Sequence, residues 1–269
     1  MLNIETYKPE RFSDLIERIW IADNFEKEVN LVIPPNQYVN LVFPLNSSKF
    51  NRNQIRINTP QIEGISTQKT VLTYPANTKL IGIRFFAFGL YPFVKLQGKE
   101  LINNSIPYPP DTEKIKKTID FPMDECDTNK IDKLYNLLSE LFCQKSYDDI
   151  SPIMNFYNQF RWEDETHTIE DYCKKSETNY TSLNRKFTKI VGLSPKGFER
   201  LIKFRKSLCS LIDSEDSLTS IGANSGYFDQ AHFIREFKIF LNQTPSNYKA
   251  LIKQTDKQSQ IINYNFKLF

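Results

Sequence analysis

The sequence predicts an α+β protein, in which a mainly β N-terminal region is followed by an all-α C-terminal domain with two helix-turn-helix motifs. Residues 1–110 show little helical periodicity and many β-branched and aromatic residues. Residues 217–249, in contrast, place apolar side chains at helical spacing around a glycine. The chain has 269 residues. It is therefore long enough for two domains, since one domain takes about 100–200 residues.

The N-terminal region is predicted to hold six strands, separated by Pro, Asn and other turn residues. The strands are residues 15–22, 28–33, 37–44, 54–57, 70–74 and 79–86. Residues 103–126 contain four prolines and are expected to form a connecting segment.

Helical periodicity begins after this segment. An amphipathic helix is predicted over residues 127–145, capped by Asp127 or Thr128, and a second helical stretch over residues 150–160. We therefore expect three parts: a β-rich domain at 1–110, a helical linker at 111–160 and an all-α domain at 161–255.

Residues 217–249 predict two short helices, a tight turn at Gly226 and the start of a third helix at Pro245. One face of this unit is apolar. Its core positions are Leu218, Ile221, Phe233, Phe237 and Phe240. Asp229 is placed to cap the second helix. The opposite face of that helix carries side chains that can contact bases or phosphates. These are Gln230, His232, Ile234, Arg235 and Lys238.

The spacing I-x4-G-Y-x-D-x2-H-F-x-R-x-F-K-x6-P-x2-Y, from Ile221 to Tyr248, resembles the signature of AraC-type transcription regulators. Two residues depart from that signature. Gly222 replaces the usual alanine, which lowers helix propensity by about 1 kcal/mol. Asn242 replaces the usual glycine, and asparagine also tolerates the left-handed conformation.

The resemblance implies a second, more degenerate motif, and residues 168–205 supply one. Ile169, Tyr172 and Cys173 are expected to pack its first helix. Leu183 and Phe187 are expected to pack its recognition helix. A turn from Gly192 to Pro195 then leads into a long helix that joins the two motifs. Matched position by position, the base-reading side chains of the family fall on Thr181, Asn184, Arg185, Gln230, Ala231, Ile234 and Arg235.

Residues 174–210 contain ten Lys or Arg against two Glu, a net charge of +8. A run of this kind is often just a solvated face. On a helix-turn-helix it also fits contacts to phosphates, which hold the register without reading the sequence. We assign backbone contacts to Lys186, Lys189, Lys196, His232 and Lys238.

The segments PPNQYVNLVFPL and KLIGIRFFAFGLYPF resemble the sensor-like domain that precedes some AraC-type motifs. This resemblance implies a cupin-like or jelly-roll-related barrel. Trp20, Arg84, Phe86 and Phe88 are candidates for an effector pocket, and ordinary core packing is the alternative for each. For the helix at 127–145 the family suggests dimerisation, whereas packing of its apolar stripe against the barrel is the alternative.

Composition argues against catalysis. The two histidines, His167 and His232, both lie in the C-terminal half, so the barrel offers no imidazole for a metal. No cofactor is expected. The four cysteines are far apart, which suggests neither a disulfide framework nor a zinc site. No apolar run approaches the roughly 18–20 residues of a membrane span, so we expect a soluble cytoplasmic protein and no membrane partner.

The sequence therefore predicts a bacterial, sequence-specific transcription regulator of AraC type that binds double-stranded DNA. The further partners we consider are RNA polymerase, a small-molecule effector of unknown identity and a second copy of the chain. The alternative is a ligand-binding sensor or protein-interaction module whose helical half no longer reads DNA. Gly222 and the apolar Ile234 keep this alternative open.

Overall fold

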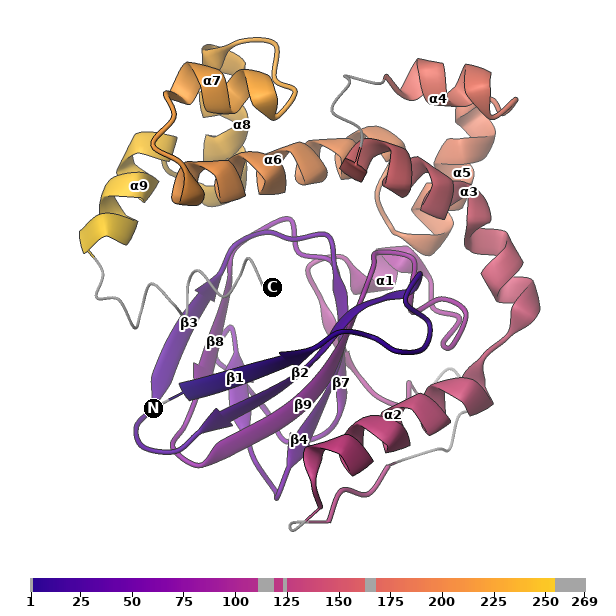
Figure 1. Ribbon diagram of the computed structural model, residues 1–269, viewed down its shortest axis with the longest axis vertical. Coiled ribbons are helices and arrows are strands. Elements are labelled where there is room, and N and C mark those ends of the chain that lie inside the picture. The colour runs from indigo at the N-terminus through magenta and orange to yellow at the C-terminus, as the bar shows by residue number, and fades with distance from the viewer. Residues whose placement is uncertain (1, 111–118, 123–124, 163–167, 255–269) are drawn as a thin grey trace.

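The computed structural model describes residues 2–110, 119–122, 125–162 and 168–254. Strands make up the first half, and helices cap one end of it (Figure 1). The strands are β1 (Leu2–Tyr7), β2 (Ile16–Asn24), β3 (Val29–Ile33), β4 (Val39–Leu45), β5 (Phe50–Arg52), β6 (Ile55–Ile57), β7 (Gln61–Glu63), β8 (Thr70–Tyr74), β9 (Thr78–Phe85) and β10 (Ser105–Pro107). The helices are α1 (Gly98–Leu101), α2 (Asp127–Leu141), α3 (Gln144–Trp162), α4 (Ile169–Lys175), α5 (Tyr180–Ile190), α6 (Pro195–Asp213), α7 (Leu218–Asn224), α8 (Gln230–Leu241) and α9 (Pro245–Gln254). The predicted α+β fold class is confirmed.

The strands form two antiparallel sheets, one in the order β1-β2-β9-β4-β7-β10 and one in the order β3-β8-β5-β6. All six predicted strands are present, as β2, β3, β4, β6, β8 and β9, with ends that differ by at most two residues. The sequence reading missed β1, β5, β7 and β10. Three of these have only three residues, too few for an alternating pattern to be recognised.

Side chains alternate along β9 and divide the N-terminal half into two cores. Ile81, Ile83 and Phe85 belong to the large core, which continues into the helices. Leu80 faces the other sheet and belongs to a smaller core between the two sheets. The other members of this inner core are Trp20, Ala22, Leu31, Val42, Phe50, Ile57, Leu72 and Tyr74.

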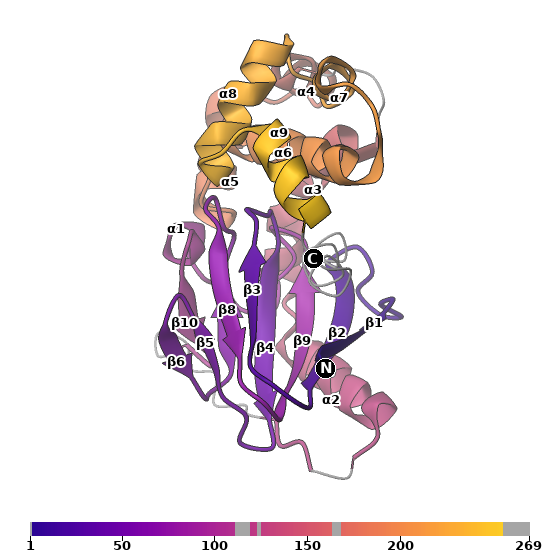
Figure 2. The ribbon, with the colours of Figure 1, turned by 90° about the vertical axis from the view of Figure 1, so that its left-hand side faces the viewer.

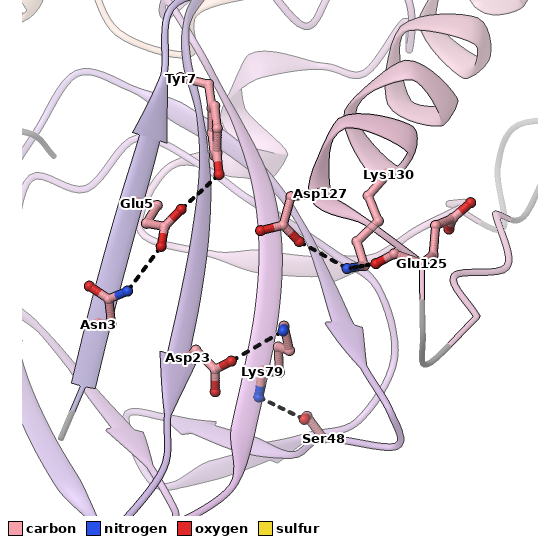
Figure 3. Close-up of polar contacts among 9 residues, drawn as sticks. All are labelled: Asn3, Glu5, Tyr7, Asp23, Ser48, Lys79, Glu125, Asp127 and Lys130. Atoms are coloured by element: carbon pink, nitrogen blue, oxygen red, sulfur yellow. Dashed lines mark hydrogen bonds and ion pairs between the residues drawn. The ribbon is translucent and has the colours of Figure 1, made fainter.

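The polar contacts of β1 show which of its faces is turned outward. The Glu5 carboxylate accepts hydrogen bonds from Asn3 Nδ2 at 3.1 Å and from Tyr7 Oη at 2.8 Å (Figure 3). Leu2 and Ile4, which alternate with these residues, pack against the inner core. Nearby, Lys79 Nζ pairs with Asp23 Oδ2 at 3.2 Å across β9 and β2.

Helix α2 runs along the outside of the six-stranded sheet (Figure 1). Leu134, Leu137 and Leu138 are buried in the large core, so the apolar stripe packs against the β domain. The predicted cap was wrong, because Cys126 holds the N-cap position without a side-chain hydrogen bond. Asp127 instead pairs with Lys130 Nζ at 2.9 Å (Figure 3). The helix also ends four residues earlier than predicted, at Leu141.

The next helix, α3, is longer than the predicted stretch at 150–160 and contains Pro152 within it. The predicted connecting segment at 103–126 lies partly outside the described residues. Within it, Ser105–Pro107 forms β10, which pairs with β7.

The helical half rests on one end of the β domain (Figure 2). At this junction α1 meets the end of α5 backbone to backbone. A Cβ added at Gly98 would lie 2.2 Å from Gly192 N, and one added at Gly192 would lie 2.4 Å from Gly98 O. Only glycine permits so close an approach at either position.

Candidate nucleic-acid interface

The helical half contains the same three-helix unit twice. Residues of α4 correspond to residues of α7 at a spacing of 49, and residues of α5 correspond to residues of α8 at a spacing of 50. Thr168 and Ser217 cap the first helix of each unit, and each hydroxyl accepts a hydrogen bond of 3.1 Å from the amide three residues ahead. The second copy predicted upstream of the signature is therefore present.

Both recognition helices, α5 and α8, begin with a side-chain cap. Asn179 Oδ1 accepts a hydrogen bond from Ser182 N at 2.8 Å, and Asp229 Oδ1 accepts one from His232 N at 2.6 Å. Such caps satisfy amides that the first turn of a helix leaves without partners. The predicted role of Asp229 is confirmed.

The inner faces of α5 and α8 are apolar and aromatic. Phe187 packs edge-on against Phe156 of α3 with ring centroids 4.9 Å apart, and Phe240 stacks on Phe204 of α6 at 4.5 Å. The buried positions of the two helices match one to one. They are Leu183 and Phe233, Phe187 and Phe237, and Ile190 and Phe240.

Packing against α8 gives a physical reason for the unusual glycine of α7. A Cβ at Gly222 would lie 3.2 Å from Phe233 Cβ, which is closer than most side-chain contacts. The absence of a side chain at this position lets the two helices approach.

Both recognition helices end in the left-handed conformation, with φ of 85° at Gly192 and 57° at Asn242. Glycine adopts this conformation without strain, and asparagine is one of the few other residues that tolerate it. The replacement of glycine by asparagine in the second motif therefore preserves the end of the helix.

The outer faces of α5 and α8 are polar or half-buried. Thr181, Arg185 and Arg235 are exposed, whereas Asn184 and Ile234 are half-buried. Ala231 is exposed next to Gln230. Gln230 Oε1 accepts a hydrogen bond of 2.8 Å from Thr219 Oγ1 of α7, which fixes its side-chain amide at the start of the helix.

Two groups can be distinguished among the cations of the helical half. Some hold the helices together: Arg200 donates to both carboxylate oxygens of Glu236, at 2.7 and 3.0 Å, and Lys203 pairs with Glu199. Arg205 is buried within α6. The second group forms no ion pair within the described part of the chain. It consists of Arg185, Lys186, Lys189, Lys196, Arg235 and Lys238.

His232 is half-buried at the first turn of α8. Its Nδ1 accepts a hydrogen bond from Phe228 N at 3.4 Å, and its ring meets the edge of Tyr227 at a centroid distance of 5.4 Å. The side chain thus braces the turn before α8. The other histidine, His167, lies outside the described residues.

The sequence reading missed Phe228, whose side chain is 93% exposed directly before the cap of α8. An aromatic ring so exposed at the entrance to a recognition helix has no packing role in the described structure. The available signal was its position, because it falls between Tyr227 and Asp229, two residues of the matched signature.

Comparison with known proteins agrees with this geometry. Residues 172–250 match a family model described as a helix-turn-helix domain. An uncharacterised helix-turn-helix transcriptional regulator of Staphylococcus aureus (strain MSSA476) is 26% identical over 98 residues, which are 36% of this chain. Residues 172–250 form an AraC-type helix-turn-helix domain.

A second relative of the AraC-type domain is an uncharacterised helix-turn-helix transcriptional regulator of Haemophilus influenzae (strain Rd), 26% identical over 84 residues. This second match spans 31% of this chain and 28% of the Haemophilus protein. The match to the Staphylococcus protein spans only 13% of that protein's length. Residues 5–107 match a family described as a domain of unknown function (DUF6597). The solved structure of ToxT from Vibrio cholerae aligns with 93% of this chain and 98% of that chain, at 12% identity and a TM-score of 0.48.

Ahead of the AraC-type domain, the β half encloses a cavity of about 40 Å³ between its sheets. Trp20 and Arg84, two of the candidates for an effector pocket, line it. Phe86 and Phe88 do not line it, because they pack on Tyr157 of α3 with ring centroids 5.4 and 5.8 Å away. For these two residues the alternative of core packing is the one that the structure supports.

Charged groups face this cavity. Arg52 Nε lies 3.7 Å from Glu63 Oε1, and burial raises the pKa of Glu63 despite this cation. Burial lowers the pKa of Arg84, and the Glu17 carboxylate at 3.7 Å opposes this shift. The Arg84 guanidinium also stands over the ring of Tyr38 at 4.8 Å.

None of the helices in the described residues combines the length and the apolar character that crossing a bilayer requires. Across the same residues, no cluster of His, Cys, Asp and Glu is arranged to hold a metal ion.

Proposed function

We propose that the protein is a sequence-specific DNA-binding transcription regulator, in which α5 and α8 enter successive major grooves about 34 Å apart on one face of the duplex. The observation that carries this proposal is the repetition of the recognition helix. Arg185 and Arg235 occupy the same position in the two copies, are exposed, and form no ion pair with any described residue.

The base-reading roles follow from side-chain chemistry. An arginine can donate two hydrogen bonds to guanine, and an amide such as that of Asn184 or Gln230 can pair with adenine. Ala231 and Ile234 offer apolar contact to a thymine methyl group. Thr181 supplies a hydroxyl at the start of the first recognition helix.

The backbone contacts are assigned to Lys186, Lys189, Lys196 and Lys238, whose ammonium groups suit phosphate oxygens. His232 supports the turn before α8, and we assign its side chain a contact to the DNA backbone beside that turn. These residues set affinity and its dependence on salt rather than the choice of sequence.

We further propose three parts: a regulatory β domain at 1–110, a helical linker at 111–160 and the DNA-binding domain at 161–255. The β domain takes an effector, with Trp20 and Arg84 as the contacts, and the protein has no catalytic role. RNA polymerase and a second copy of the chain are proposed partners from the family resemblance. The burial of the apolar stripe of α2 argues against that helix as the dimer contact.

The test measures binding of single variants to a duplex that the protein selects. Replacing Arg235 or Arg185 by alanine is expected to cost about 1–3 kcal/mol and to relax preference at one base pair. Lys189→Ala is expected to weaken binding to all sequences alike and to reduce the salt dependence of binding by about one counterion. Lys27→Ala, which removes an exposed cation from the β domain, is the matched control and should leave binding unchanged.

Two outcomes would count against the proposal. Equal losses on all sequences from both the arginine and the lysine variants would contradict the assigned roles. Failure of the folded protein to prefer any duplex over another would favour the alternative, a ligand-binding sensor or protein-interaction module whose helical half no longer reads DNA.

A further inference from the structure

The two recognition helices share one pattern of burial. At the spacing of 50 residues, positions 181–185 and 187–190 of α5 are buried, half-buried or exposed in the same way as their counterparts in α8. Equivalent side chains of the two helices therefore face the same way. A chemical difference between two such side chains is then a difference in what the two motifs present to a duplex.

Three of these outward positions change from polar in the first motif to apolar in the second. The pairs are Thr178 and Phe228, Thr181 and Ala231, and Asn184 and Ile234. Phe228 is 93% exposed, Ala231 is exposed and Ile234 is half-buried. Apolar groups gain free energy when a partner removes them from water, so this surface favours a partner with apolar groups of its own.

The charges of the two helices differ in the same direction. Three cations and no carboxylate lie on α5, whereas α8 has two cations and the carboxylate of Glu236. Ile239, which is 60% exposed, stands where α5 has Lys189. The second recognition helix therefore attracts phosphates less strongly than the first and offers more apolar surface.

The apolar positions of the second motif lie on the face that the proposed function turns toward DNA. The first residues of a recognition helix contact base edges, and Phe228 and Ala231 lie at the start of α8. Ile234 is directly followed by Arg235, the assigned base-reading arginine. The major groove presents one apolar group, the 5-methyl group of thymine, which alanine and phenylalanine can recognise by contact. Cytosine lacks this methyl group, so the contact distinguishes the two pyrimidines.

We propose that the second motif reads its half-site through thymine methyl groups, with Phe228 as a further specificity-determining residue beside Ala231 and Ile234. The first motif reads its half-site by hydrogen bonds and makes the larger share of the phosphate contacts. This inference rests on the proposed DNA-binding function and adds a chemical difference between the two half-sites. The half-site of the second motif is therefore rich in thymine.

The test replaces thymine by uracil in the duplex that the full chain selects from a random pool, one half-site at a time. Uracil forms the same base pair and lacks only the methyl group. Loss of one contacted methyl group is expected to raise the Kd about fourfold. Uracil throughout the second half-site, identified as the one where Arg235→Ala relaxes the preference, should raise the Kd at least about tenfold. In the first half-site the increase should not exceed about fourfold, because Thr181 offers one methyl group.

Matched variants connect this uracil effect to the named side chains. The triple variant Phe228→Thr, Ala231→Thr and Ile234→Asn gives α8 the residues of the first motif, which α5 and its preceding turn already accept at the same positions. It should reduce the uracil effect in the second half-site to about fourfold or less. Phe228→Thr alone should reduce that effect about fourfold. Asn184→Ala, the control in the first motif, should leave it unchanged. Circular dichroism at the helical band checks that each variant is folded.

Equal uracil effects in the two half-sites would overturn the proposal, as would a second half-site without thymine. An unchanged uracil effect in the folded Phe228→Thr variant would overturn the role of Phe228 and would indicate that its ring meets another protein instead. The failure of this inference differs from the failure of the proposed function. A selected duplex that tolerates uracil contradicts the methyl contacts alone, whereas a pool without any enriched duplex contradicts both.

Discussion

Replacing Phe237 by alanine is expected to destabilise the second helix-turn-helix motif and to unfold it locally. Its side chain is fully buried in α8 and contacts three other rings, those of Phe204, Phe233 and Tyr248, at centroid distances of 5.5, 5.7 and 5.8 Å. Removal of a buried phenylalanine costs about 3–5 kcal/mol through lost transfer energy and the cavity left behind. We expect about 4 kcal/mol here, because rings from α6, α8 and α9 would all lose a partner.

This loss is a large part of the roughly 5–15 kcal/mol that stabilises a typical domain. The assay is urea unfolding of the full chain followed by circular dichroism at the helical band, with hydrogen exchange to locate the opened segment. Ile239→Ala is the matched control, because Ile239 lies two residues away on the same helix and is 60% exposed. It is expected to change stability by less than about 0.5 kcal/mol. Similar losses for the two variants would refute the assigned core.

Three further changes test other parts of the structure. Gly98→Ala would place a Cβ 2.2 Å from Gly192 N, so α1 and α5 must separate, and calorimetry is expected to show a loss of about 1–3 kcal/mol. Glu236→Gln removes the charge that Arg200 binds, and urea unfolding is expected to show a loss of stability of about 1 kcal/mol. This value is small for a charged hydrogen bond because the Arg200 side chain is 42% exposed and solvent screens the ion pair. Glu63 has a raised pKa, so the folded state binds its proton more tightly, and stability should fall as pH rises above about 4.3; Glu63→Gln should remove this slope.

Each change has its own contradicting result. Gly197→Ala, within α6, adds the same methyl group where the nearest atom is Ser194 Oγ at 3.3 Å, and equal losses for the two glycine variants would contradict the close approach of α1 and α5. If Glu236→Gln leaves the free energy of unfolding unchanged at every salt concentration, the ion pair contributes nothing to stability. An unchanged pH slope in Glu63→Gln would assign the slope to another group.

Sequence reasoning identified the helical half well because its signals are local. The cap at Asp229, the turn at Gly226 and the apolar spacing along α8 are all set by residues within a few positions of one another. Such signals survive in a single sequence because helix ends and helix faces are determined by neighbouring side chains.

The features that the sequence reading missed depend on contacts between distant segments. The need for glycine at position 98 comes from the backbone of Gly192, and the fit of Gly222 comes from Phe233. The strand β10 forms only because Ser105–Pro107 meets β7. Phe86 and Phe88 were predicted near a pocket because they come directly after β9, the strand that contains Arg84. In the structure, Tyr157 of helix α3 is their packing partner. Periodicity along one strand does not reveal which helix will cover it.

The central claim is that the two recognition helices read DNA together. The most direct test is selection of bound sequences from a random duplex pool by the full chain at about 150 mM salt, where attraction between charges alone is already weakened. The account predicts an enriched motif with two half-sites about 10–10.5 base pairs apart, and a relaxed preference at one base pair of one half-site in Arg235→Ala. A pool without enrichment, from protein whose helical content is intact, would contradict it.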